Sequence, residues 1–294
     1  MEPSVVFEAH EHYVLSLVFS ADSQTLVSSG MDGSIKLWSV DPWQQVGTLE
    51  GHARSVNALA VSPDGRLLAS GSSDATVRLW SFPDGQLVHT LQDRKKSVAD
   101  VTFSGDGLFV AAAFHGGRAA IWNRDGRLVK SIVVCKHNLS SVALSPDGHL
   151  LATAGLSGDI TVWSLPKGQL VATLATKAAA AGWLRFIGGG RELVSLGYQE
   201  DVIMWDTSTW QRSHTYAMGR WGVRSLVVSP DEALLGLGMR GMLQLRSTID
   251  MELQAELSVS TPVISAIAFS PDGRWLAVTA ADSRVRIWRL RRFI

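Results

Sequence analysis

Cysteine, net charge and long apolar runs are all scarce in this sequence of 294 residues. The single cysteine, Cys135, excludes an intrachain disulfide and fits a reducing compartment, so we expect a cytoplasmic protein. Lys and Arg number 27, as do Asp and Glu, which leaves no net charge to attract nucleic acid or an anionic membrane. No run approaches the roughly 18 apolar residues of a membrane span, and the first residues lack the regions of a signal peptide.

What the sequence does contain is one block repeated seven times. Its copies end near residues 38, 80, 122, 163, 205, 246 and 288, at intervals of 41 or 42 residues, and six of the seven end in Trp. A period of roughly 40–45 residues with a terminal Trp is typical of a β-propeller blade. The seven units occupy the whole chain, so we expect one domain, residues 1–294, rather than the two that length alone suggests.

The second copy shows the strand pattern most clearly. It contains four short β-rich segments, residues 46–49, 56–62, 67–71 and 76–80. Gly, Pro and Asp separate these segments, as expected for strands joined by turns. A Ser-Pro-Asp-Gly turn follows the second segment and recurs in two other copies, at 145–148 and 270–273. The sequence therefore predicts an all-β fold, a seven-bladed β-propeller with four-stranded antiparallel blades.

The second copy also carries a motif made of Gly51-His52, Asp74 and Leu79-Trp80. By this motif the chain resembles the WD-repeat family of β-propellers, and the resemblance covers essentially the whole chain. The Asp that gives the family its name follows Trp only at Trp205-Asp206. In that family the first strand of each repeat completes the preceding blade. The resemblance therefore implies that residues 4–9 pair with the strand ending at Trp288 and close the ring, which removes an open sheet edge.

Two adjacent copies repeat a set of His, Ser, Asp and Trp at identical spacing. The sets are His10, Ser28, Asp32 and Trp38, and His52, Ser70, Asp74 and Trp80. Ser, His and Asp together suggest a nucleophilic triad, but two copies argue against a unique active site. The resemblance implies instead a structural hydrogen-bond network from Trp through Ser and His to Asp, which satisfies buried polar groups. We therefore expect no catalytic residues and no enzyme activity.

The other five copies have lost parts of this set. In the sixth copy Met218, Arg240 and Arg246 stand at the His, Asp and Trp positions, and in the seventh Asp282 and Trp288 remain. The sequence therefore predicts that the first two blades are the most regular. The degenerate blades should depend more on apolar packing.

Two other patterns bear on ligands. Residues 236–241 spell G-x-G-x-x-G, but a dinucleotide site needs a helix after the glycines, and an alternating strand pattern follows here. His10, His12 and His115 are not accompanied by a cluster of Cys or carboxylate residues, which a zinc site would need for its remaining ligands. We therefore expect no cofactor and no metal.

The resemblance places the loops with the Gly-His-type residues and the Asp turns on one face, the top face. The partner site that we predict there, centred on blades 5 and 6, comprises Tyr198, Arg220, Trp221, Met239, Arg240, Lys95 and Lys136. Tyr198 and Met239 directly precede the Asp position of the motif, where side chains should point to solvent. Trp, Tyr and Arg are frequent binding hot spots, and the lysines favour an acidic partner.

The predicted function is a non-catalytic scaffold that binds a protein or peptide through the top face. Such a chain would serve as a subunit or a domain of a larger assembly. Two alternatives stay open: an enzyme that uses the central channel of the propeller, and a nucleic-acid-associated subunit that binds through the basic top loops. A membrane partner is not expected, and the balanced charge disfavours nucleic acid.

Overall fold

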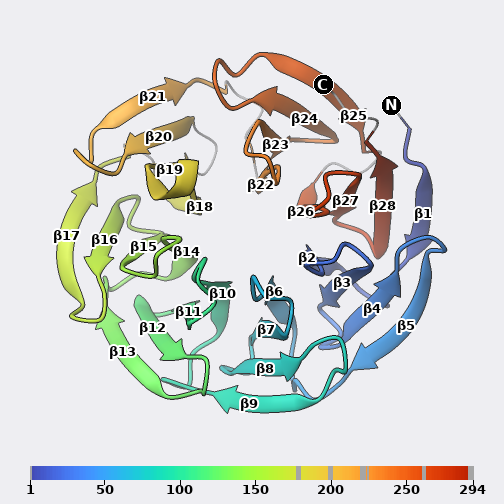
Figure 1. The fold of residues 1–294 in the computed structure, drawn as a ribbon, viewed down its shortest axis with the longest axis horizontal. Coiled ribbons are helices and arrows are strands. Elements are labelled where there is room, and N and C mark those ends of the chain that lie inside the picture. Colours follow the sequence, from blue (N-terminus) through green and yellow to red (C-terminus); the bar gives the residue numbers. More distant parts are fainter. Residues whose placement is uncertain are drawn as a thin grey trace. The chain divides into compact units, whose positions relative to one another are not determined.

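The structure is a computed structural model that describes residues 2–176, 180–197, 201–218, 223, 225–259 and 263–290. The chain divides into two compact units, unit 1 (Met1–Leu59 and Trp221–Ile294) and unit 2 (Ala60–Arg220). Within the described residues the strands form seven four-stranded antiparallel sheets, here called blades 1 to 7 (Figure 1). The fold is a seven-bladed β-propeller, which confirms the prediction from the repeats.

Unit 1 contains three of these sheets. Blade 1 consists of β2 (Val14–Phe19), β3 (Thr25–Gly30), β4 (Ile35–Ser39) and β5 (Gln44–Leu49). Blade 6 consists of β22 (Ser225–Val228), β23 (Leu234–Gly238), β24 (Met242–Ser247) and β25 (Leu253–Ser258). Blade 7 consists of β26 (Ile264–Phe269), β27 (Trp275–Ala280), β28 (Arg284–Arg289) and β1 (Val5–Glu8).

Unit 2 contains blades 3 to 5 and most of blade 2, whose first strand begins in unit 1. Blade 2 consists of β6 (Val56–Val61), β7 (Leu67–Ser72), β8 (Val77–Ser81) and β9 (Leu87–Leu91). Blade 3 consists of β10 (Val98–Phe103), β11 (Phe109–Phe114), β12 (Arg118–Asn123) and β13 (Leu128–Val133). Blade 4 consists of β14 (Leu139–Leu144), β15 (Leu150–Gly155), β16 (Ile160–Ser164) and β17 (Gln169–Leu174). Blade 5 consists of β18 (Ala181–Ile187), β19 (Glu192–Gly197), β20 (Val202–Asp206) and β21 (Arg212–Tyr216), with a 3-10 turn at Gly188–Gly190.

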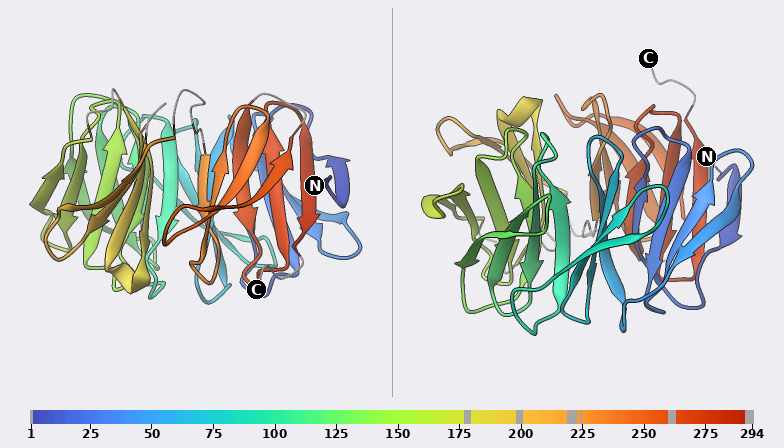
Figure 2. Two further views of the ribbon diagram at one scale, coloured as in Figure 1. Left: turned by 90° about the horizontal axis from the view of Figure 1, so that it is seen from above. Right: turned by 60° about the horizontal axis from the view of Figure 1, so that its bottom comes forward.

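The N-terminal strand belongs to the sheet formed by the C-terminal strands. β1 pairs antiparallel with β28 in a register that runs from Val5 opposite Ile287 to Glu8 opposite Arg284. In both views of Figure 2 the blue N-terminal strand lies beside the red strands of blade 7. The predicted pairing of the N-terminal segment with the last repeat is confirmed. It covers an edge of β28 that would otherwise be open to another chain.

The middle strands are buried on both faces, and the core lies between neighbouring blades of each unit. All six residues of β7 are buried, as are five of the six in β3. In unit 1, Leu243 of blade 6 and Trp288 of blade 7 belong to one buried cluster. In unit 2, Val162 of blade 4 and Trp205 of blade 5 belong to another. Near-continuous apolar runs form these strands because neither face meets water.

The Ser-x-Asp turns between the first and second strands of six blades share one geometry. In blade 2 the Asp64 carboxylate accepts bonds from the Ser62 hydroxyl at 2.6 Å and the Arg66 N–H at 3.1 Å. Gly65 follows at φ 69°, a left-handed conformation that glycine adopts readily. The Ser62 hydroxyl bond, together with the Arg124 guanidinium and the Arg66 N–H, outweighs desolvation and lowers the pKa of Asp64 to about 2. The same two bonds recur at Asp22, Asp106, Asp147, Asp231 and Asp272.

The glycine-rich run at residues 236–241 covers the end of β23 and the turn into β24. A strand follows it, as the alternating pattern predicts, so the strand–helix geometry of a dinucleotide fingerprint is not formed. No helix in the described ranges has the length and hydropathy to cross a membrane.

Candidate functional site

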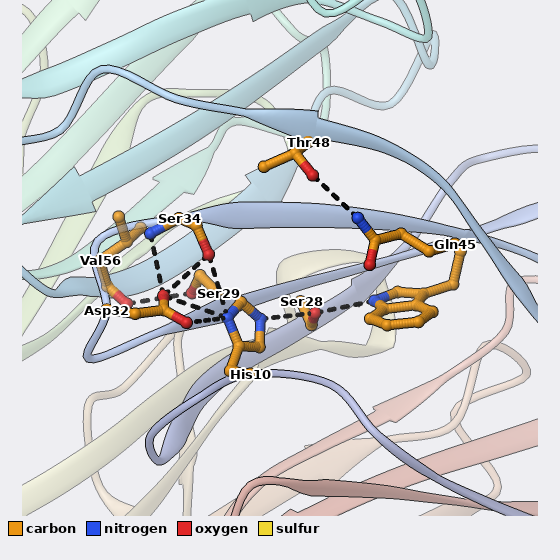
Figure 3. A network of polar contacts seen from close by, with 9 residues as sticks. His10, Ser28, Ser29, Asp32, Ser34, Gln45, Thr48 and Val56 are labelled. Atoms are coloured by element: carbon orange, nitrogen blue, oxygen red, sulfur yellow. Dashed lines mark hydrogen bonds and ion pairs between the residues drawn. The ribbon is translucent and has the colours of Figure 1, made fainter.

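In blade 1 the four residues of the motif form one chain of hydrogen bonds (Figure 3). Trp38 on β4 donates its indole N–H to the Ser28 hydroxyl at 2.9 Å, and this hydroxyl lies 2.9 Å from His10 Nε2. His10 Nδ1 lies 2.9 Å and 3.1 Å from the two Asp32 carboxylate oxygens. Since Trp38 can only donate, Ser28 donates onward to His10, and the imidazole donates to Asp32.

The surroundings of this network fix its protonation. Burial lowers the pKa of His10, although the Asp32 carboxylate opposes that shift, so the imidazole is neutral at pH 7. Burial acts to raise the pKa of Asp32, but hydrogen bonds from the Ser34 N–H and hydroxyl, together with His10, hold it below its usual value. The Ser28 side chain has no solvent exposure. The geometry resembles a Ser-His-Asp triad in its bonds, but no substrate can reach this hydroxyl.

The second set is distributed over both units. In unit 2 the Trp80 indole donates to the Ser70 hydroxyl at 2.8 Å, and the Asp74 carboxylate accepts the Thr76 N–H at 2.9 Å and its hydroxyl at 2.7 Å. His52 is half-buried in unit 1. Ser70, like Ser28, is completely buried.

Blades 4, 6 and 7 use a position that sequence reasoning missed, two residues before the closing residue. In blade 4 the Trp163 indole donates to Thr161 at 3.0 Å, and in blade 6 Arg246 Nε donates to Gln244 at 2.9 Å. In blade 7 Arg286 forms an ion pair with Asp282 at 2.6 Å. The available signal was a polar residue at this position of the third strand in each of these copies.

Blade 3 replaces the His–Asp contact by an ion pair. Asp93 lies in the loop after β9, and its carboxylate accepts Arg118 Nε at 3.1 Å and the Ser131 hydroxyl at 2.8 Å. Arg118 and Ser131 belong to blade 3, so Asp93 links the segment that leaves blade 2 to the next sheet. In blade 5 the described residues include the inner end of the motif, where the Trp205 indole donates to the Ser195 hydroxyl at 2.8 Å.

The predicted partner residues have different outcomes. Arg240 in unit 1 and Lys95 and Lys136 in unit 2 are exposed. Met239 is 6% exposed, so the expectation that its side chain points to solvent is wrong. The thioether is removed from water, as apolar groups generally are, although Met31, at the same motif position in blade 1, is 50% exposed. Tyr198, Arg220 and Trp221 lie outside the described residues.

Two exposed apolar side chains of blade 1 were not predicted as partner residues. Tyr13 and Met31 are each 50% exposed. Their loops are joined by a hydrogen bond from the Met31 N–H to the Tyr13 carbonyl at 3.0 Å. Among the residues with described positions, no group of three or more His, Cys, Asp or Glu is arranged to hold a metal ion.

Comparison with known proteins shows similarity to a family of β-propellers and to a fission-yeast protein. Residues 13–288 match the family described as the IFT122 first β-propeller. A stretch of 104 residues is 29% identical to a Schizosaccharomyces pombe protein named Target of rapamycin complex subunit wat1. This stretch covers 34% of the chain and 32% of the relative, so the similarity spans about a third of each protein.

Proposed function

The chain belongs to the family of the IFT122 first β-propeller, and from this we propose that it is a non-catalytic WD-repeat scaffold that binds a protein or peptide segment through its top-face loops. The yeast relative is named as a subunit of a complex, which supports a role as a subunit or domain of a larger assembly. The single cysteine supports a cytoplasmic location.

This proposal rests on the observation that the residues most similar to a catalytic triad, Ser28, His10 and Asp32, are hydrogen-bonded to one another and to Trp38 in the interior of the blade. Ser28 has no solvent exposure, and its oxygen contacts both the Trp38 indole and the His10 imidazole. A nucleophile for hydrolysis must be reachable by a substrate and by an oxyanion site. We expect no reaction of Ser28 or Ser70 with a fluorophosphonate probe. Stoichiometric labelling of either serine would instead support the enzyme alternative.

Exposed loop residues supply the surface for a partner. Arg240 stands at the Asp position of blade 6 and is exposed, and Lys95 and Lys136 are exposed in unit 2. Cations favour an acidic segment and raise its rate of capture. Tyr198, Arg220 and Trp221 stay in the proposed site on sequence grounds, while buried Met239 is removed from it.

Matched substitutions test this surface in unit 1. We expect Arg240→Ala combined with Trp221→Ala to abolish capture of partners from native lysate. Arg274→Ala is the control, because Arg274 is an equally charged side chain directly after a Ser-Pro-Asp-Gly turn of the same unit, and this side chain is 75% exposed. The site is supported if the double variant loses the partners that Arg274→Ala retains, with melting curves unchanged. Retention of the same partners by the double variant contradicts it.

A corresponding pair tests the lysines of unit 2. Lys95→Ala with Lys136→Ala should weaken capture, whereas Arg66→Ala, also exposed and in the same unit, should not. Retention on a polyanion matrix that falls steeply with salt, and that these lysine variants lose, would favour the nucleic-acid alternative. Capture that persists on nuclease treatment favours a protein partner.

A further inference from the structure

Asp100 is a carboxylate held between two blades of unit 2. It lies half-buried on β10 of blade 3. One of its oxygens accepts the Ser141 hydroxyl at 3.0 Å and the Val142 N–H at 3.0 Å, both from β14 of blade 4. The other oxygen accepts the Val101 N–H at 2.9 Å. Two of its three bonds therefore cross from one blade to the next.

The equivalent position in blade 1 makes the same kind of bond without a charge. Ser16 and Asp100 each follow the bulge of the first strand and each stand 22 residues before the closing Trp. The Ser16 hydroxyl accepts the Leu59 N–H at 3.1 Å, as Asp100 accepts that of Val142. A neutral hydroxyl is thus enough to join neighbouring first strands, and Asp100 adds an ionisable group to that junction.

We propose that Asp100 is a pH-responsive latch between blades 3 and 4, whose ionised form accepts both donors of β14 and whose protonated form weakens the bond to Val142. A carboxylate accepts charge-assisted hydrogen bonds. Once protonated, the carboxyl group carries a donor of its own and accepts less strongly. The proposal is independent of the partner site.

The strands around Asp100 contain no other titratable side chain that would titrate together with it. The strands packed most closely against β10 are β7, β11 and β14. None of these three strands contains Asp, Glu, His, Lys, Arg, Cys or Tyr, and Asp100 is the only titratable residue of β10. Desolvation by burial raises the pKa of Asp100 to about 6, against the opposing effect of the bonds from Val142, Ser141 and Val101. The latch therefore titrates near pH 6.

The sign of the effect on stability follows from the raised pKa. The folded chain binds this proton more tightly than the unfolded chain, in which the pKa of Asp is 3.8. The contribution of Asp100 to the folding equilibrium constant therefore grows as pH falls from about 6 to about 4, on the order of a hundredfold at most. Acid weakens one hydrogen bond to β14 but removes a charge that is partly withdrawn from water.

The direct test is the backbone amide of Val142, followed by NMR in the full chain between pH 4.5 and 7.5. Its proton resonance should move upfield on acidification with a midpoint near 6, because its acceptor loses charge. The amide of Leu59 is the internal control, since its acceptor is the Ser16 hydroxyl. A Val142 resonance that does not titrate in this range overturns the proposal.

A second measurement uses Asp100→Ser, which places at this junction the group that blade 1 uses. The unfolding free energy of the wild type should rise relative to that of the variant as pH falls from 7.5 to 4.5. If Asp100→Ser does not fold, Asp100→Asn replaces it, because the difference in pH dependence, not in absolute stability, is the readout. Identical pH dependence of the wild type and the variant overturns the latch.

Discussion

Blades 1 and 6 lie in the same unit and differ at every position of the hydrogen-bonded motif. The residues of blade 1 and their counterparts in blade 6 are His10 and Met218, Ser28 and Gly236, Asp32 and Arg240, Trp38 and Arg246. In blade 1 the bonds join the loop before β2 to the β3–β4 turn and to β4. In blade 6 they join β24 to β25 and to the turn between them.

Blade 6 satisfies its polar side chains through a different set of hydrogen bonds. Arg246 donates to the Gln244 side chain at 2.9 Å and to the Met251 carbonyl at 2.8 Å, and Gln244 donates to Glu256 at 2.7 Å. A side chain at Gly236 is disfavoured, because its Cβ would lie 2.8 Å from a methyl group of Val227. The two blades show that a blade needs its buried polar groups satisfied, whichever side chains achieve this. In blade 6 Arg240 is left exposed.

Removal of residues 2–9 should cause the largest loss of stability among these tests. It affects the blade 1 network and leaves the residues of the blade 6 network unchanged. Blade 7 loses its outer strand, and the segment that delivers His10 to blade 1 is no longer anchored. The Phe7 ring, 4.5 Å from that of Trp38 between centroids, is also lost. We expect the melting temperature to fall by several degrees, or the protein to aggregate through the open edge of β28. An unchanged melting curve and monomer peak would contradict this.

Asp32→Ala should cost about 1–3 kcal/mol of unfolding free energy, because it leaves His10 and the Ser34 N–H without their acceptor. At the matching position of blade 6, Arg240→Ala should change stability by less than about 0.5 kcal/mol, as exposed substitutions usually do. Urea unfolding of both variants measures the contrast. Asp32→Asn is the control and should lose less, since it keeps an acceptor oxygen. Equal losses for Asp32→Ala and Arg240→Ala would remove the distinction between the two blades.

The stability of blade 1 should also depend on pH, because its network contains the titratable side chain of His10. Blade 6 has Met218 at this position, which does not titrate. The lowered pKa of His10 means that the folded chain binds this proton less tightly than the unfolded chain. The His10 contribution to unfolding free energy is therefore full above pH 6.5 and declines as pH falls below it. The difference between the wild type and His10→Gln, measured by urea unfolding from pH 7.5 to 5, should shrink on acidification. A constant difference would show that folding leaves the pKa of His10 unchanged, and would contradict this prediction.

The fold could be predicted from the sequence because the number and length of the repeats indicate the number of blades and their strands. Seven copies with a fixed period and six closing Trp residues predict seven blades, and the spacing from His10 to Trp38 predicts which side chains meet. The exposure of Met239 could not be predicted, since the same motif position is exposed at Met31 and buried at Met239. The exposure of a side chain depends on the packing around its turn, and the register of the repeats does not specify that packing.

The polar networks that replace the motif in blades 6 and 7 could not be predicted for a related reason. Comparison with the motif shows what Arg246 and Asp282 have lost, but their new partners, Gln244 and Arg286, lie at a position that the motif leaves unspecified. Asp100 was hidden because one carboxylate within an otherwise apolar strand gives no periodic signal. Two of its three partners come from another repeat, 41 and 42 residues away along the chain.

Among the substitutions that break a hydrogen-bond network, Gln244→Met in blade 6 should have the smallest effect. This nearly isosteric change removes the acceptor of Arg246 Nε and the donor to Glu256. Arg246 is half-buried and keeps its bond to the Met251 carbonyl, and Glu256 is exposed. Water can therefore replace part of what is lost, and we expect a cost below about 1 kcal/mol in urea unfolding. Ser28→Ala in blade 1, where Trp38 and His10 lose a shared and fully buried partner, should cost more. If Gln244→Met costs as much as Ser28→Ala, the blade 6 network supports its blade as strongly as the motif supports blade 1.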